Sequence, residues 1–125
     1  MPGRILIVED DAFLAMLLCD LLYESGYEVV GVAADAKGAI QHAARGNPDV
    51  VLADIHLRGH VDGIQAAIEI KKRHDTEVVF LTSADDSATV ERAKIAHPAA
   101  YLNKPTDLLR VVDAVERALT AKHAA

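Results

Sequence analysis

The sequence predicts one α/β domain over residues 1–125, built on a parallel sheet with helices on both faces. Short segments rich in Val, Ile and Leu alternate with longer amphipathic segments along the whole chain. The short segments are continuously apolar, as expected for parallel strands that are buried on both faces. Because this alternation fills all 125 residues, enough for one hydrophobic core, we expect no second domain.

Five strands and five helices are expected, and residues typical of helix ends mark several boundaries. In chain order they are a strand at Ile5–Val8, a helix at Ala12–Ser25, a strand at Glu28–Ala33, a helix at Ala36–Arg45, a strand at Val50–Ala53, a helix at Gly63–His74, a strand at Val78–Leu81, a helix at Ser87–Lys94, a strand at Ala99–Leu102 and a helix at Asp107–Lys122. Residues that favour the N-cap position stand before four helices: Asp11, Asp35, Asp62 and Thr106. Gly26 follows the first helix, and Gly46-Asn47-Pro48 ends the second.

The composition excludes several classes of protein. A net charge of -6 argues against a nucleic-acid-binding surface, which requires a clustered basic face. The single Cys19 excludes an internal disulfide and fits a reducing compartment. The longest apolar run, Ala12–Cys19, is too short to cross a bilayer, and the N-terminus lacks the order of a signal peptide. We therefore expect a cytoplasmic protein that contacts neither nucleic acid nor membrane.

Polar residues follow four of the five expected strands. In an open parallel sheet, functional sites lie beyond the carboxyl ends of the strands, where the strand order reverses. The residues at these ends are Glu9, Asp10 and Asp11, then Asp54, then Thr82 and Ser83, and finally Asn103, Lys104 and Pro105. They converge only if the first strand lies between the second and the third, which is the order 2-1-3-4-5.

Glu9, Asp10 and Asp54 carry carboxylates that would repel one another in a shared pocket. Two unit charges about 4 Å apart interact by ~4 kcal/mol at an effective dielectric constant of about 20. Lys104 offsets only one of the negative charges of Glu9, Asp10 and Asp54. A hard divalent cation offsets the rest, and Mg²⁺ suits an incomplete cage of oxygen ligands that keeps several waters. The sequence therefore predicts a Mg²⁺ site.

Asp54 is the acid that stands alone at its strand end, so we expect it to be the nucleophile. The hydroxyl of Thr82, the ammonium of Lys104 and the metal ion can each neutralise or bond an oxygen of a phosphoryl group. Attack by the Asp54 carboxylate on a phosphoryl donor would give an acyl phosphate.

Four segments of the chain carry a resemblance to a known family. They are ILIVEDD (5–11), VLADIHLRGHVDGI (51–64), VVFLTS (78–83) and YLNKP (101–105). In this order and spacing, the chain resembles the receiver domain of two-component response regulators, within the superfamily of the chemotaxis regulators. The resemblance implies a flavodoxin-like fold, with five βα units in three layers and the strand order 2-1-3-4-5. It also implies a signalling switch and not a turnover enzyme.

The resemblance assigns the chemistry of phosphorylation to individual residues. Asp54 would accept a phosphoryl group from a phosphohistidine of a sensor histidine kinase or of a phosphotransfer protein. Mg²⁺, or Mn²⁺ in its place, would be bound directly by Asp10, by Asp54 and by the backbone carbonyl of His56. Glu9 would hold the metal mainly through water.

The resemblance also implies how the signal leaves the site. Thr82 would move to bond the phosphoryl group, Lys104 would pair with it, and Tyr101 would turn inward. Pro105 would follow a cis peptide bond, which needs a structural reason. The changed surface would be the face of the fourth helix, the fifth strand and the fifth helix, read by a downstream effector protein. We expect a monomer or a weak homodimer.

Two segments depart from the family pattern. The loop after Asp54 usually has a Pro where this chain has Arg58, and the stretch Leu57–Gly63 is one residue longer than the commonest form. His97-Pro98 stands where a Gly-Ala pair is common. The first departure bears on the conformation of the loop and not on the pocket, and the second bears on the surface near Tyr101.

Simpler structural roles compete with functional ones at several positions. Helix capping alone explains Asp11, and Ser83 is a small residue that lets the phosphoryl group approach. Tyr101 is either a switch residue or a half-buried strand residue. A carboxylate pocket for a hard cation needs no imidazole, so His56 and His60 are expected at the surface. We hypothesise that His56 lies at the pocket mouth and modulates water attack, in which case His56→Ala would change the dephosphorylation half-life.

The first helix has more apolar surface than a solvated helix requires. Five leucines follow the helical period and should face the sheet: Leu14, Leu17, Leu18, Leu21 and Leu22. Phe13, Met16 and Tyr23 are left on the outer side. They are either partly buried against the last helix or form a docking surface for the phosphohistidine helices of the kinase.

Other functional classes fit the sequence less well. Phosphatases of the haloacid-dehalogenase type need a second acid two residues after a nucleophile on the first strand, and topoisomerase-primase domains need a D-x-D pair, which Asp54-Ile55-His56 lacks. The G-x-x-x-x-G-K-[ST] motif of nucleotide-binding proteins is absent from the sequence. A receiver that serves only as an interaction module stays open, although Thr82 and Lys104 count against it. The chain is either a stand-alone receiver or the N-terminal receiver of a longer regulator.

Overall fold

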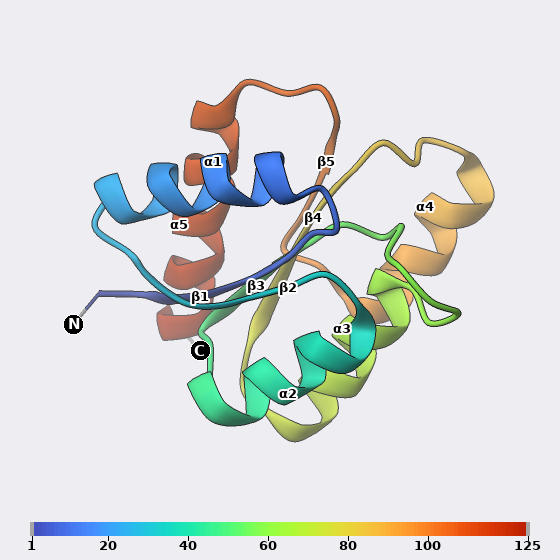
Figure 1. Ribbon diagram of the computed structural model, residues 1–125, viewed down its shortest axis with the longest axis horizontal. Coiled ribbons are helices and arrows are strands. Elements are labelled where there is room, and N and C mark those ends of the chain that lie inside the picture. The colour runs from blue at the N-terminus through green and yellow to red at the C-terminus, as the bar shows by residue number, and fades with distance from the viewer. Residues whose placement is uncertain (1, 125) are drawn as a thin grey trace.

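Five parallel strands form one sheet, in the order β2-β1-β3-β4-β5, in the computed structural model of the chain, which describes residues 2–124. The strands are β1 (Arg4–Val8), β2 (Glu28–Ala33), β3 (Val50–Ala53), β4 (Glu77–Thr82) and β5 (Ala100–Asn103). The helices are α1 (Ala12–Glu24), α2 (Ala36–Gly46), α3 (Gly63–Arg73), α4 (Ser87–Ala93) and α5 (Leu108–Ala124), with a 3₁₀ turn, η1 (Lys94–Ala96), after α4. The predicted fold class and strand order are confirmed (Figure 1).

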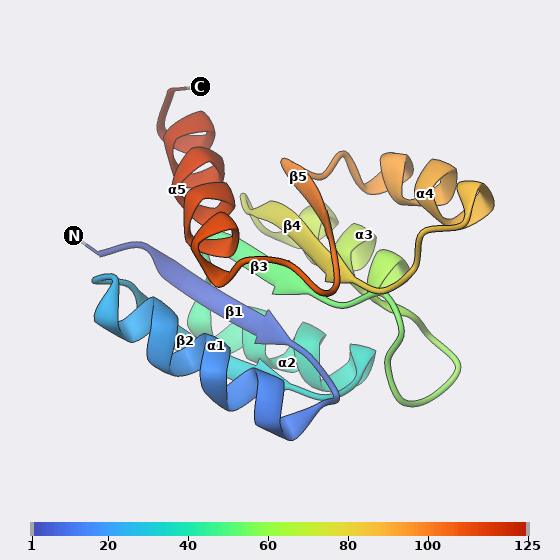
Figure 2. The same ribbon diagram turned by 90° about the horizontal axis from the view of Figure 1, so that it is seen from above.

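Helices cover both faces of the sheet, α1 and α5 on one face and α2, α3 and α4 on the other (Figure 1, Figure 2). Because side chains alternate along a strand, each central strand contributes to both cores. On β1, Ile5 and Ile7 belong to the core under α1 and α5, whereas Leu6 and Val8 belong to the core under α2 and α3. Within residues 2–124, none of the helices combines the length and the apolar character that crossing a membrane requires.

Three of the four predicted N-caps are confirmed, because their carboxylates accept backbone N–H groups from the first turns of the following helices: Asp11, Asp35 and Asp62. The prediction for Thr106 was wrong. Helix α5 begins at Leu108, so Asp107 directly precedes it, and Asp107 Oδ1 accepts the N–H of Leu109 at 2.9 Å. The carboxylate of Asp107 therefore caps the helix one residue later than expected.

The five leucines of α1 that were predicted to face the sheet differ in burial. Leu18 and Leu22 are buried, Leu14 and Leu21 are half-buried, and Leu17 is exposed, so the prediction was wrong for Leu17. Leu17 lies about 100° around the helix from Leu18, which points at the sheet, because an α-helix has 3.6 residues per turn. The outer side chains of α1 are exposed: Phe13, Met16 and Tyr23.

Asp49 links the amino ends of β1 and β3 to the end of α5. Its Oδ2 accepts the backbone N–H of Arg4 at 2.9 Å, and its Oδ1 accepts a hydrogen bond from the ammonium of Lys122 at 2.6 Å. Burial alone would raise the pKa of Asp49, but the hydrogen bonds from Lys122 and Arg4 outweigh burial and hold that pKa below its usual value. This ion pair stabilises the edge of the sheet opposite to the polar strand ends.

Candidate functional site

The hydrogen-bond ladder of the sheet continues past the carboxyl ends of the strands and positions three polar residues. The N–H of Glu9 donates to Ala33 of β2, and the N–H of Asp54 donates to Val8 of β1, both at 2.8 Å. The N–H of Lys104 donates to the last carbonyl of β4, also at 2.8 Å. These backbone bonds hold the three residues just beyond β1, β3 and β5, at one end of the sheet.

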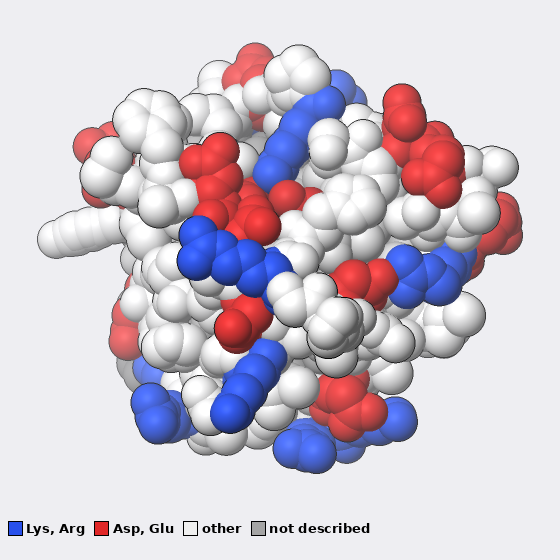
Figure 3. Space-filling view, turned by 45° about the vertical axis from the view of Figure 1, so that its right-hand side comes forward, with Lys and Arg blue, Asp and Glu red and all other residues white. Residues whose placement is uncertain are grey.

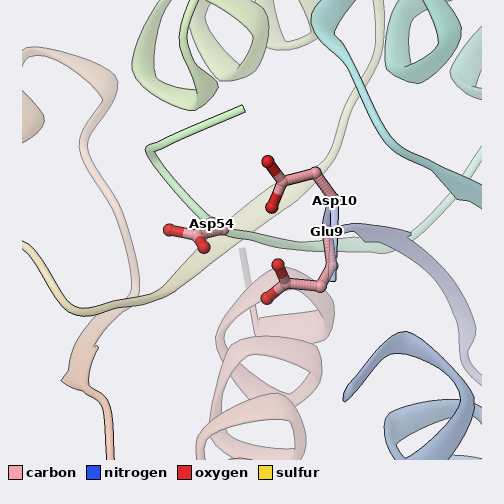
Figure 4. Close-up of side chains that lie close together, drawn as sticks. All are labelled: Glu9, Asp10 and Asp54. Atoms are coloured by element: carbon pink, nitrogen blue, oxygen red, sulfur yellow. The ribbon is translucent and has the colours of Figure 1, made fainter. Parts of the chain in front are cut away.

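Three carboxylates face one another at this edge (Figure 4). Glu9 and Asp10 follow β1, Asp54 follows β3, and one ligand oxygen from each lies within 4.8 Å of the other two. Glu9 and Asp54 are buried, with 3% and 7% of their surface exposed. We call these three residues the acidic pocket. The ammonium of Lys104 donates to Glu9 Oε1 at 2.6 Å and to Asp54 Oδ2 at 2.8 Å, so it bridges the two buried acids.

The environment of the acidic pocket shifts the pKa values of the bridged groups. Burial raises the pKa of Glu9, and the hydrogen bond from Lys104 only partly offsets that effect. Burial alone would lower the pKa of Lys104, but hydrogen bonds to Asp54 and Glu9 outweigh burial and raise it. Lys104 is therefore a cation at neutral pH.

Both oxygens of the Asp54 carboxylate are oriented. Oδ1 accepts the backbone N–H of His56 at 3.2 Å, and Oδ2 accepts a hydrogen bond from Lys104. The start of α3 holds the backbone directly after Asp54, because the N–H of Gly63 donates to the carbonyl of Ile55 at 2.7 Å. A Cβ atom on Gly63 would lie 1.9 Å from the carbonyl oxygen of Asp54, so this close approach requires glycine.

The donor set of the acidic pocket fits a hard divalent cation. Every side-chain ligand is a carboxylate oxygen, the type that Mg²⁺ prefers. Three carboxylates and the one ammonium of Lys104 sum to a charge of -2. Among the hydrogen bonds and ion pairs described for residues 2–124, none joins Asp10 to a cation. The negative charge of Asp10 is therefore the one that only a bound metal ion would neutralise directly.

Thr82 and Tyr101 meet at the backbone of Ala84. Thr82 is fully buried at the end of β4, and its Oγ1 accepts the N–H of Ala84 at 3.3 Å. The carbonyl of Ala84 accepts the hydroxyl of Tyr101 at 2.6 Å and the side-chain amide of Asn103 at 3.1 Å. The half-buried ring of Tyr101 packs edge-on against Phe80, with ring centroids 6.2 Å apart. The backbone of Ala84 therefore links Thr82 at the end of β4 to Tyr101 and Asn103 of β5.

Comparison with known proteins decides the family. Residues 5–116 match the model of the response regulator receiver domain. The chain belongs to this family. Receiver domains are signalling domains of two-component systems, and this membership confirms the resemblance seen in the sequence.

Individual relatives agree with this assignment. The receiver is 40% identical to the transcriptional regulatory protein PdtaR of Mycobacterium tuberculosis over 95% of its own length and 58% of that protein. It is 35% identical to the chemotaxis protein CheY of Thermotoga maritima, covering 94% of this chain and 98% of that one. The signal receiver domain of a modulated diguanylate cyclase from Desulfovibrio desulfuricans G20 superimposes with a TM-score of 0.92 at 33% identity, covering 99% and 98% of the two chains.

The structure also describes the other residues that the sequence singled out. The Lys104–Pro105 peptide bond is cis. The side chains of His56, His60 and Ser83 are exposed. The role of the His56 carbonyl as a metal ligand, and the movements of Thr82 and Tyr101, stay predictions.

Sequence reasoning missed several supporting residues of the receiver. Asp11 caps α1 as expected, but its N–H also donates to Glu9 Oε2 at 3.1 Å and so orients that acid. Asp62 forms an ion pair with Arg92 at 2.5 Å, which joins the start of α3 to α4. These partners are distant in sequence or act through the backbone, so residue patterns carry no signal for them.

Proposed function

We propose that this receiver is a phosphoacceptor switch, phosphorylated at Asp54 by a phosphohistidine of a sensor histidine kinase or of a phosphotransfer protein. One observation carries the proposal: the Asp54 carboxylate is oriented by His56 and Lys104 inside a pocket that is short of positive charge. A nucleophilic carboxylate with nearby cations is the arrangement that phosphoryl transfer to Asp requires.

Transfer proceeds by attack of one Asp54 oxygen on the phosphorus atom of the donor. The new P–O bond forms as the P–N bond of the phosphohistidine breaks, and the electron pair of that bond returns to the imidazole nitrogen. The ammonium of Lys104, already 2.8 Å from Oδ2 of Asp54, neutralises charge on the transferred group. Mg²⁺, or Mn²⁺ in its place, held by Glu9, Asp10, Asp54 and the carbonyl of His56, would supply further charge neutralisation. Hydrolysis of the acyl phosphate releases phosphate, regenerates the Asp54 carboxylate and so resets the switch.

The phosphoryl group carries roughly -1.5 to -2 charges and takes the place of the single negative charge of the Asp54 carboxylate. The hydroxyl of Thr82 is drawn toward this group and gives up its contact with the Ala84 amide. The hydrogen bond from Tyr101 to the Ala84 carbonyl then changes in turn, which carries the signal to the α4, β5 and α5 face. A shift from mostly inactive to mostly active requires about 5 kcal/mol of differential stabilisation, which charge-assisted bonds to Thr82 and Lys104 can contribute.

The outer side of α1 is the proposed docking surface for the phosphodonor protein. Phe13, Met16 and Tyr23 are 66%, 53% and 69% exposed, so α5 does not cover them. Apolar side chains on a helix suit a helix-on-helix contact with the kinase. Phe13→Asp and Met16→Asp should abolish phosphotransfer from the cognate kinase and leave labelling by acetyl phosphate intact. Unchanged phosphotransfer would refute the docking surface.

The proposed phosphorylation is tested by incubating the receiver with Mg²⁺ and acetyl phosphate and measuring the intact mass. We expect one phosphate adduct on the wild type, none on Asp54→Asn, and loss of the adduct when Mg²⁺ is chelated. Labelling that persists in Asp54→Asn would contradict the assignment of the phosphoacceptor. A wild type that stays unlabelled by both acetyl phosphate and a cognate kinase would contradict the function.

A further inference from the structure

The loop between β3 and α3 crosses over the carboxyl end of β1. Strand β1 lies between β2 and β3 in the sheet. Arg58, in this loop, forms a parallel β-bridge with Asp35, which lies two residues after β2. Because the bridge joins the extensions of β2 and β3, the backbone at Arg58 passes over the place where Glu9 and Asp10 emerge from β1.

Arg58 lines the same cavity as two residues of the acidic pocket. Glu9, Asp10 and Arg58 border a cavity of about 370 Å³, whose other walls include Met16 of α1 and Val32 of β2. Acidic side chains gather near the middle of this face, and basic side chains lie across and beside them (Figure 3). Arg58 therefore shares a cavity wall with Glu9 and Asp10, two of the three acids of the acidic pocket.

The charges in and next to this cavity are unequally paired. Lys104 is bonded to Glu9 and Asp54 and has no direct bond to Asp10. Within residues 2–124, the side chain of Arg58 makes no hydrogen bond and no ion pair, and Asp10 pairs with no cation. The loop thus brings Arg58, a cation with no ion pair described within residues 2–124, next to Glu9 and Asp10 of a pocket with a charge of -2.

We infer that Arg58 sets the balance between cation binding and anion binding at the acidic pocket, an inference that rests on the function proposed above. The positive charge of Arg58 repels Mg²⁺ and weakens its binding. The same charge attracts the phosphoryl group of an incoming donor, because guanidinium groups pair readily with phosphate oxygens. Arg58 therefore weakens the binding of Mg²⁺ and strengthens the binding of the phosphoryl donor, the two species that must reach Asp54.

The test compares Arg58→Gln, Arg58→Lys and wild type, with Lys37→Gln as a matched control. Lys37 lines a neighbouring cavity of about 390 Å³ together with Arg58, but it does not line the cavity of Glu9 and Asp10. Mg²⁺ affinity is measured by isothermal titration calorimetry without any phosphodonor. Donor binding is measured as the acetyl phosphate concentration that gives half of the maximal labelling rate at saturating Mg²⁺.

We expect Arg58→Gln to bind Mg²⁺ about threefold more tightly and to need about threefold more acetyl phosphate, both at low ionic strength. The maximal labelling rate stays unchanged. Both shifts shrink in high salt, because salt screens exposed charges. Arg58→Lys keeps the charge and restores both values toward wild type, and Lys37→Gln matches wild type.

Opposite shifts separate an electrostatic role from structural damage, which would weaken both affinities together. The inference would be overturned if Arg58→Gln bound both Mg²⁺ and acetyl phosphate more tightly, if it bound both more weakly, or if its Mg²⁺ affinity did not change. The Mg²⁺ titration needs no phosphorylation. A wild type that fails to accept phosphate would therefore count against the proposed function, while the titration alone would still support or overturn the role of Arg58.

Discussion

The ammonium of Lys104 lies 2.8 Å from Asp54 and 2.6 Å from Glu9, so one cation bridges two buried carboxylates. The side chain of Lys104 is only 23% exposed, and those of Glu9 and Asp54 are 3% and 8% exposed. Water screens such contacts weakly, which makes the bridge important for folding as well as for phosphoryl transfer.

Replacing Lys104 by Met should destabilise the metal-free receiver. The change leaves two buried carboxylates without their cation, and breaking a buried ion pair in this way costs about 3 kcal/mol. Added Mg²⁺ should recover part of this loss, because a divalent cation takes over the neutralisation. Urea unfolding in chelator and in excess Mg²⁺ measures both values. If Lys104→Met lost the same unfolding free energy in chelator and in excess Mg²⁺, Lys104 and Mg²⁺ would not neutralise the same carboxylates.

Gly63→Ala should destabilise the receiver and disturb Asp54. The added Cβ would lie 1.9 Å from the Asp54 carbonyl oxygen, so α3 or the strand end must move, at a cost of about 3 kcal/mol. Gly59→Ala is the matched control, since Gly59 has a φ of 90° but open space around it. An alanine at this φ is strained, so Gly59→Ala should lower the free energy of unfolding by about 1 kcal/mol. If thermal unfolding showed equal losses for both, the close approach would not be the cause.

The ion pair of Asp49 and Lys122 should give the receiver a measurable acid sensitivity. The folded pKa of Asp49 is below its usual value of 3.8, so the folded state binds fewer protons than the unfolded state in that range. The resulting stability is fully present above pH of about 4 and is lost as the pH falls through the folded pKa. Asp49→Asn removes this contribution, which we expect to be about 2 kcal/mol at neutral pH.

The Asp49 prediction is checked by chemical unfolding of wild type and Asp49→Asn at several pH values. The difference in unfolding free energy should shrink as the pH falls below about 4. Asp113→Asn is the control, because its ion pair with Arg117 is exposed on α5 and should contribute little. A difference between wild type and Asp49→Asn that is constant with pH would rule out the ionised Asp49 as the source.

Tyr101→Phe should uncouple the output surface from the acidic pocket. The change removes the hydroxyl that bonds the Ala84 carbonyl, at a cost of about 1 kcal/mol, because Asn103 still satisfies that carbonyl. Labelling of Asp54 by acetyl phosphate should be unaffected. Hydrogen exchange of the β4–α4 loop should respond to phosphorylation less than in wild type. An identical response in the two proteins would remove Tyr101 from the relay.

The helix caps show which structural features a local sequence pattern can predict. Asp11, Asp35 and Asp62 were predicted correctly, because capping depends on a carboxylate and on the next few backbone amides. Thr106 was predicted wrongly because two adjacent residues, Thr106 and Asp107, both suit the position. Leu17 was placed on the buried side because the helical period alone does not tell how wide that side is.

The sequence by itself determined the alternation of strands and helices and the identity of the acids and the lysine at the strand ends, and its resemblance to receiver domains implied the strand order. These features depend on apolar periodicity, on capping and on the rule that parallel strands present their carboxyl ends at one edge. The tertiary structure alone decided that Lys104 bridges Glu9 and Asp54, that Gly63 touches the backbone of Asp54, and that the loop of Arg58 crosses over β1. Each of these contacts joins separate elements, and its geometry depends on how those elements pack, which no local pattern encodes.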